Sequence, residues 1–187
     1  MGLLSEGITE IIAVTKDNAA PIGIISKSGQ TTPKMILFKG SKTAENVKKY
    51  GWVTANFVSD CYLYPQYAFS DAEISDLREV AVGRHKMQIL NSADAWMAFE
   101  AKILNETENT YFVSLEPVAS EYIRDDLRPV NRGFNSIIDA TVYATRYVLT
   151  HDKAQLDLIN YHLGIVKKCG GSRELESAAL IERVCGL

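Results

Sequence analysis

Residues 41–60 read SKTAENVKKYGWVTANFVSD and predict a helix followed at once by a strand. Ser41 is a typical helix N-cap and Gly51 is typical of the position just past a helix end, so we expect the helix to cover Lys42–Tyr50. The apolar and β-branched run after it predicts a strand over Trp52–Val58. We therefore expect one short helix within a region whose other segments predict strands.

Five further apolar segments flank this unit and are typical of strands. They are Ile8–Thr15, Ala20–Ser26, Pro33–Phe38, Trp96–Leu104 and Tyr111–Val118. Lys16-Asp17-Asn18 has turn chemistry and makes the first two a hairpin. Residues 59–93 are mixed, and we expect a short helix from Asp71 to about Glu79 and then polar loop. Six strands are enough to close, or nearly close, a small barrel.

The chain changes to helical periodicity after the charged, Pro-containing segment Arg124–Arg132. Apolar residues at helical spacing follow from Phe134. Asp152 and Ser172 are the expected N-caps of a second and a third helix. The sequence therefore predicts an α+β, mostly-β protein, with a split-barrel domain over residues 1–123 and a C-terminal helical subdomain over residues 124–187.

Composition narrows the classes of function. The net charge of −3 and the lack of a basic stripe argue against a nucleic-acid partner. No apolar run reaches the roughly 18 residues that span a bilayer, and the first residues lack a signal-peptide pattern, so we expect a cytoplasmic protein without a membrane partner. Cys61, Cys169 and Cys185 are widely spaced, which favours reduced thiols over a disulfide or metal site.

Three short segments have residues suited to binding a ligand. Ser41, Lys42 and Thr43 offer free backbone N–H groups at a helix start, two hydroxyls and an ammonium, which suit a phosphate. NAAPIG, residues 18–23, has small residues that let a flat ligand approach the backbone. Asn56 adds an amide that can donate and accept. Taken alone, each has a simpler explanation, because Ser41 could be only a cap, Asn18 only a turn residue and Asn56 only an exposed strand residue.

Together the three segments resemble the flavin-reductase-like family of FMN-binding split β-barrels. SKTAENVKKYGWVTANFVSD is similar to its phosphate-binding helix and following strand, and NAAPIGII is similar to its Asn-x-Ala-Pro segment. ADAWMAFEAKILNETENTYFVSLEPV, residues 93–118, resembles its late hairpin. Order and spacing agree over about residues 8–120. The tail NRGFNSIIDATVYATR resembles a small archaeal group, domain-of-unknown-function family 447, whose members look like FMN-binding split barrels.

The resemblance implies an FMN cofactor and a homodimer with the flavin near the subunit interface. The residues that match the phosphate-binding stretch are Ser41, Lys42 and Thr43. Those that match the segment beside the isoalloxazine ring are Asn18, Ala20, Pro21, Ile22 and Gly23, and Asn56 matches the Asn of the strand after the helix. The serine usual after the proline is absent, with Ile22-Gly23 in its place, which argues against the hydride-transfer pocket of a true flavin reductase.

Three hypotheses follow. The first is a flavin-dependent oxidoreductase of unknown substrate, with no convincing side-chain acid–base pair and therefore no assigned catalytic residue. NADH or NADPH is a candidate electron donor, and because no G-x-G-x-x-G motif follows a strand, it would have to stack on the flavin itself. The alternative is a non-catalytic FMN carrier or sensor. The third is a barrel that binds no ligand.

Overall fold

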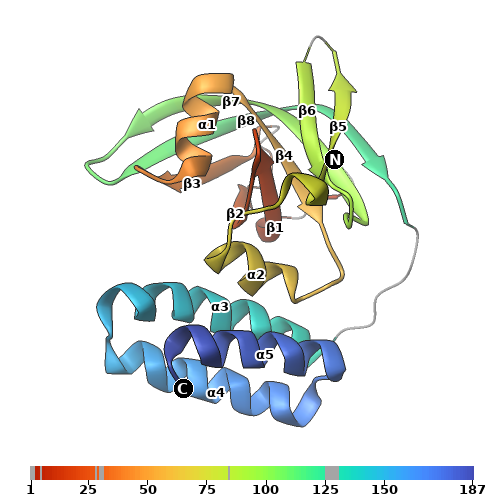
Figure 1. Cartoon of the computed structure of the whole chain (residues 1–187). Coiled ribbons are helices and arrows are strands. Elements are labelled where there is room, and N and C mark those ends of the chain that lie inside the picture. Colours follow the sequence, from red (N-terminus) through yellow and green to blue (C-terminus); the bar gives the residue numbers. More distant parts are fainter. Residues whose placement is uncertain (1–2, 5, 28, 30–31, 84, 125–130) are drawn as a thin grey trace. The chain divides into compact units, whose positions relative to one another are not determined.

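In the computed structural model, the described residues contain six strands that close into a barrel in the order β1-β2-β3-β8-β7-β4 (Figure 1). The residues that the structure describes are 3–4, 6–27, 29, 32–83, 85–124 and 131–187. The strands are β1 (Gly7–Thr15), β2 (Asn18–Ser26), β3 (Lys34–Phe38), β4 (Trp52–Phe57), β7 (Ala95–Glu106) and β8 (Thr110–Tyr122). Neighbouring strands are antiparallel. The mostly-β barrel predicted from the sequence is confirmed.

Alternating side chains fill the barrel. In β3, Met35 and Leu37 are buried while Ile36 and Phe38 are exposed, as a pleated strand requires. Ala44 and Val47 come from α1 (Lys42–Tyr50), which links β3 to β4 and packs into the same core. The other buried members of this core are Ile11, Ala13, Ile24, Val53, Ala55, Met97, Phe99, Val113 and Leu115.

A hairpin that the sequence did not predict covers part of the outer barrel wall. It consists of β5 (Leu77–Val82) and β6 (His85–Leu90), and the 3₁₀ turn η1 (Ile74–Asp76) precedes it. Its inner face packs with the outer face of β4 and β7 in a second apolar cluster of Trp52, Val82, Met87, Ile89, Trp96 and Ala98. The predicted helix from Asp71 to about Glu79, with loop after it, is therefore wrong. Arg78 and Glu79, two consecutive exposed charged residues of β5, interrupt the apolar pattern that would have indicated a strand.

The second strand begins two residues earlier than predicted. Asn18 pairs with Thr15 as the first residue of β2, so the connection to β1 is the two-residue turn Lys16-Asp17. Asp17 has φ 51°, a left-handed conformation that Asp adopts more readily than most residues. This tight turn fixes Asn18 in the sheet instead of leaving it in a loop.

A second compact unit contains residues 59–70 and 126–187, whereas residues 1–58 and 71–125 form the barrel unit. Its helices are α2 (Leu63–Phe69), α3 (Arg132–Thr150), α4 (Lys153–Cys169) and α5 (Ser172–Cys185). The sequence did not predict α2, which the structure places with the helices. The boundary between residues 123 and 124 stays a prediction.

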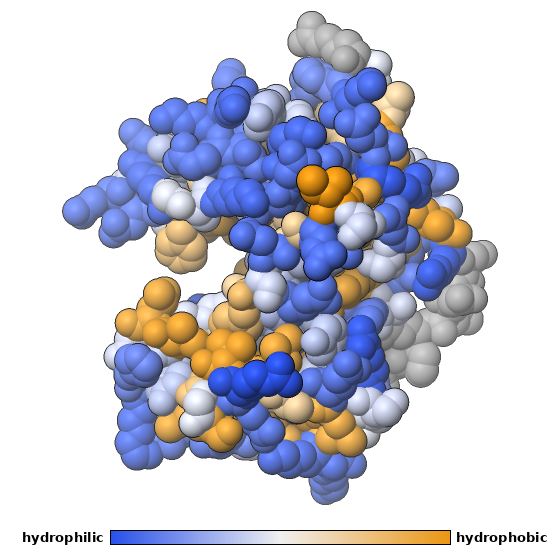
Figure 2. Space-filling view, in the orientation of Figure 1, coloured by the Kyte–Doolittle hydropathy of each residue, from blue (hydrophilic) through white to orange (hydrophobic). Residues whose placement is uncertain are grey.

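The helical unit has well-formed helix ends. Asp152 accepts a hydrogen bond from the backbone N–H of Ala154 at 2.9 Å, as its predicted capping role requires. Ser172, predicted to be a cap, is instead the first residue of α5, because Gly171 takes the cap position and donates to Glu174 at 2.9 Å. Figure 2 shows apolar side chains on the surface of this unit. Val142, Val148, Leu149 and Leu158 are among its exposed residues.

No helix among the described residues is long and apolar enough to cross a membrane. Cys61, Cys169 and Cys185 form no disulfide in the structure: Cys61 is buried, and Cys169 and Cys185 are partly buried. Burial raises the pKa of the Cys185 thiol. The described part of the chain also contains no cluster of side chains suited to a metal ion.

Candidate functional site

One edge of β2 is largely without a strand partner. β2 pairs with β1 along its whole length, but within the described chain it pairs with β3 only where Ile25 meets Lys34. The segment from Asn18 to Gly23 therefore has an open edge. Ala20, Pro21 and Ile22 are partly buried along it, and Pro21 fits such an edge because it has no N–H to pair.

Gly23 serves the packing of β1. A Cβ atom placed on Gly23 would lie 2.7 Å from Cγ2 of Ile8 and 3.2 Å from Oε1 of Glu10. The first contact is shorter than real Cβ atoms make and the second is tighter than most, so Gly23 leaves room for two side chains of its own hairpin. The sequence-based interpretation was that the small residues here admit a flat ligand, and for Gly23 the structure offers this different reason.

The start of α1 has the predicted cap. Ser41 Oγ accepts from the backbone N–H of Ala44 at 3.2 Å and donates to the carbonyl of Phe38 at 2.8 Å. Among the described residues, no group accepts a hydrogen bond from the backbone N–H of Lys42 or Thr43. Both therefore point out of the helix start as unused donors, where the helix dipole favours an anion.

The ammonium of Lys42, beside these donors, forms only a weak ion pair. Lys42 Nζ lies 3.4 Å from Oδ1 of Asp71, and the two side chains are 51% and 83% exposed. Exposed ion pairs of this kind contribute about 0–1 kcal/mol. The ammonium of Lys42 can therefore exchange this partner for another anion at little cost.

A buried hydrogen bond joins the first and second predicted segments. Asn18 Nδ2 donates to Oγ1 of Thr43 at 2.9 Å, and both residues are at most 5% exposed. Asn46, which is not among the predicted site residues, donates to Oγ1 of Thr15 at 3.0 Å and to the carbonyl of Lys16 at 2.7 Å. The start of β2 and the start of α1 are thus held together, as a shared site requires.

Gln88 of β6 holds the turn beside Asn18. The backbone N–H of Asp17 donates to Gln88 Oε1 at 2.7 Å, and Gln88 Nε2 donates to Asp17 Oδ1 at 2.8 Å. Because Gln88 donates to this carboxylate and Lys16 lies 3.1 Å from it, the pKa of Asp17 is below its usual value of 3.8. No sequence pattern indicated Gln88, because the segment that contains it was predicted to be a polar loop.

Asn56 has a structural role. Its side chain is fully buried, Nδ2 donates to the carbonyl of Ile12 at 3.1 Å, and Oδ1 accepts from the backbone N–H of Leu90 at 2.9 Å. These bonds tie β4 to β1 and to β6 and leave the amide little capacity for a ligand. The prediction that Asn56 contacts a flavin has no support from this geometry, and we leave Asn56 out of the site proposed below.

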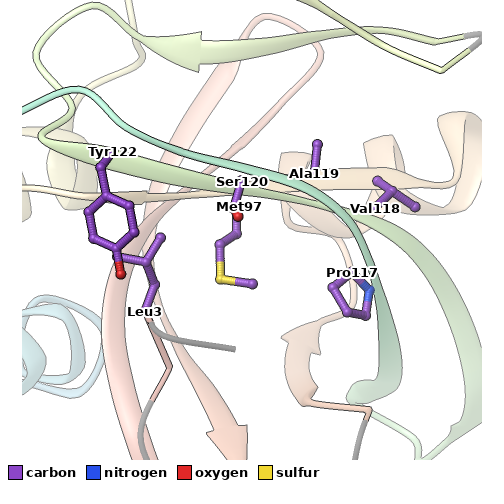
Figure 3. Close-up of a pocket in the computed structure, with 7 residues that line it drawn as sticks. All are labelled: Leu3, Met97, Pro117, Val118, Ala119, Ser120 and Tyr122. Atoms are coloured by element: carbon purple, nitrogen blue, oxygen red, sulfur yellow. The ribbon is translucent and has the colours of Figure 1, made fainter.

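A cavity of about 340 Å³ lies elsewhere in the barrel unit, beside β7 and β8. Figure 3 shows Leu3, Met97, Ser120 and Tyr122 around one space. Its other lining residues are Pro117, Val118 and Ala119. None of the lining residues carries a positive charge, and none belongs to the predicted site. The donor set at the start of α1 therefore suits a phosphate better than this cavity does.

Family models match both parts of the chain. The N-terminal domain of a protein of unknown function, DUF447, matches residues 9–124, and the model described as protein of unknown function (DUF447) matches residues 131–183. The chain belongs to the DUF447 family. This confirms the resemblance inferred from the tail and the three segments.

Solved structures resemble this DUF447 protein over nearly its whole length or over about two thirds of it. An FMN-bound DUF447 protein from Methanosarcina mazei is 39% identical, with 96% of each chain covered and a TM-score of 0.90. A flavin reductase domain protein from Arthrobacter is 13% identical, with 65% of this chain and 80% of the other covered and a TM-score of 0.51. An FMN-binding protein from Thermus thermophilus is 13% identical over 66% and 75%, with a TM-score of 0.50. The last two share the fold alone.

Proposed function

We propose that this protein binds FMN, with the phosphate at the start of α1 and the isoalloxazine ring along the open edge of β2. The observation that carries the proposal is the FMN-bound state of the Methanosarcina relative, which shares the fold along nearly the whole chain. The chemistry of the α1 start supports it, because the backbone N–H groups of Lys42 and Thr43 have no acceptor among the described residues, and the ammonium of Lys42 has only an exposed ion pair with Asp71.

The orientation of the hydroxyl of Thr43 supports the same placement. Its oxygen accepts from Asn18 Nδ2, and no described group accepts a hydrogen bond from the hydroxyl itself. The proton of Thr43 is therefore free to point to a phosphate oxygen. Asn18 thus contributes to the proposed site by orienting a neighbour, and Ser41 by capping the helix.

The edge of β2 suits an aromatic ring. Ala20, Pro21 and Ile22 are partly buried and largely apolar, so a flat ring lying on them would remove apolar surface from water. In the proposed arrangement the ring continues from the phosphate along β2, because Asn18 joins the start of that strand to the start of α1.

We further propose that the protein is a flavin-dependent oxidoreductase. Bound FMN would supply reversible electron transfer, and the residues above would hold and orient it. An electron donor such as NADH or NADPH would then approach the exposed face of the ring. The alternative, a non-catalytic carrier or sensor, is favoured by Ile22-Gly23, which put no hydroxyl after the proline.

Visible absorbance separates these possibilities. Purified protein reconstituted with FMN and freed of unbound flavin should retain the absorbance of oxidised flavin. Loss of that absorbance when NADH or NADPH is added without oxygen, and its return in air, is the result expected for an oxidoreductase. Retained flavin that neither nucleotide reduces would favour the carrier or sensor, and a colourless protein would refute FMN binding.

We also propose a homodimer with the flavin near the interface. An apolar patch on the outside of the barrel supports it: Ile36, Phe38 and Leu104 are 40%, 71% and 52% exposed. Phe38 ends β3, and its carbonyl accepts a hydrogen bond from Ser41 Oγ at 2.8 Å, so this patch adjoins the proposed phosphate site. Exposed apolar patches are typical of surfaces that bind another protein, and a second copy is the commonest partner.

A further inference from the structure

The side chain of Gln88 makes a reciprocal pair of hydrogen bonds with one residue of the β1–β2 turn. It accepts from the backbone N–H of Asp17 and donates to its carboxylate, at 2.7 and 2.8 Å. Asp17 has φ 51°, a left-handed conformation that costs some strain in any residue with a side chain, although less in Asp than in most. Gln88 satisfies both the backbone and the side chain of Asp17 in that conformation.

Gln88 can impose this geometry because its own strand is fixed. The residue is 6% exposed, and its backbone carbonyl accepts from Thr54 Oγ1 at 2.6 Å. Two residues further along β6, the N–H of Leu90 donates to Asn56 Oδ1 at 2.9 Å. These bonds attach β6 to β4 independently of the Gln88 side chain, so the side-chain amide acts as a fixed clamp on the turn.

The clamp acts on the next residue along the chain. Asn18 follows Asp17 directly and donates to Thr43 Oγ1 at 2.9 Å. That bond occupies the oxygen of Thr43 and leaves its proton free for an acceptor at the start of α1. A turn that relaxed from its left-handed conformation would move Asn18, and Thr43 would lose the donor that orients its hydroxyl.

We infer that Gln88 is a positioning residue for the phosphate end of the flavin, and that it sets how strongly the site prefers FMN to riboflavin. The inference rests on the proposed function. Gln88 touches no part of the proposed ligand and acts through Asp17, Asn18 and Thr43. Its effect is therefore confined to the ligand group that Thr43 would contact, which is the phosphate that riboflavin lacks.

The test compares the dissociation constants of FMN and riboflavin, measured by quenching of flavin fluorescence. Gln88→Leu keeps the size of the side chain and removes both hydrogen bonds. We expect it to weaken FMN binding by about tenfold, the effect of losing one oriented hydrogen bond to a charged group, and to change riboflavin binding by less than about twofold. Thr141→Val is the matched control, because it removes a buried side-chain hydrogen bond, from Oγ1 to the carbonyl of Ile137 at 2.7 Å, that has no part in this network.

A second variant tests the mechanism. Glycine adopts the left-handed conformation without strain, so Asp17→Gly in the Gln88→Leu background should recover part of the lost FMN affinity. Equal weakening of FMN and riboflavin in Gln88→Leu, or the same FMN preference in Gln88→Leu as in the wild type, would overturn the inference. Wild-type protein that binds neither flavin would instead refute the proposed function.

Discussion

Replacing Lys42 with alanine should weaken FMN binding selectively. The substitution removes the ammonium beside the two unused N–H donors of the α1 start. A hydrogen bond to a charged group contributes about 1.5–3 kcal/mol. The free protein gives up a solvent-exposed ion pair with Asp71 to make that contact, which offsets about 0–1 kcal/mol. The net loss is about 0.5–3 kcal/mol, or roughly 2- to 160-fold in the dissociation constant.

Fluorescence titration with FMN and with riboflavin is the assay. Riboflavin lacks the phosphate, so its affinity should be the same in Lys42→Ala and in the wild type. Lys48→Ala is the matched control, since it removes an exposed ammonium from the last turn of the same helix. Unchanged FMN affinity in Lys42→Ala, or an equal loss in Lys48→Ala, would refute the placement of the phosphate at this helix start.

Three further outcomes are expected. Phe38→Ser should shift the protein toward monomer in light scattering if the outer patch is the dimer surface, and an unchanged mass would remove that surface from consideration. Asn56→Leu leaves the buried N–H of Leu90 unpaired and should lower the free energy of unfolding in urea by about 1–3 kcal/mol, so an unchanged midpoint would contradict its structural role. The depressed pKa of Asp17 adds stability that is present above its unfolded value of 3.8 and is lost as the pH falls through the lower folded value. Acid unfolding of Asp17→Asn should therefore depend less on pH below about 4, and a curve identical to that of the wild type would argue against the contact with Gln88.

The barrel could be predicted because its strands follow local rules. In β3, alternate residues enter the core, and Ser41 and Gly51 limit α1 to the predicted residues. The hairpin of β5 and β6 was not predicted, because the charged residues of β5 interrupt its apolar pattern, although the inner face of the hairpin is apolar. The local pattern of apolar residues cannot reveal such a hairpin, because the hairpin forms by packing on the outer face of β4.

The burial of Asn56 has the same cause. Strand periodicity places Asn56 on the face opposite Ala55, which enters the core, and that outer face would ordinarily meet solvent. The hairpin covers this outer face of β4. The side-chain amide of Asn56, expected to be accessible to a ligand, is therefore buried and bonded to Leu90. The link between Asn18 and Thr43, 25 residues apart, likewise exists only in three dimensions.

A crystal structure of the protein with FMN tests the central claim most directly. The phosphate oxygens should lie within about 3.2 Å of the backbone nitrogens of Lys42 and Thr43, a normal hydrogen-bond distance, with the ring along the edge of β2 at Pro21. A phosphate bound away from the start of α1, or a flavin in the cavity beside Met97 and Ser120, would contradict it.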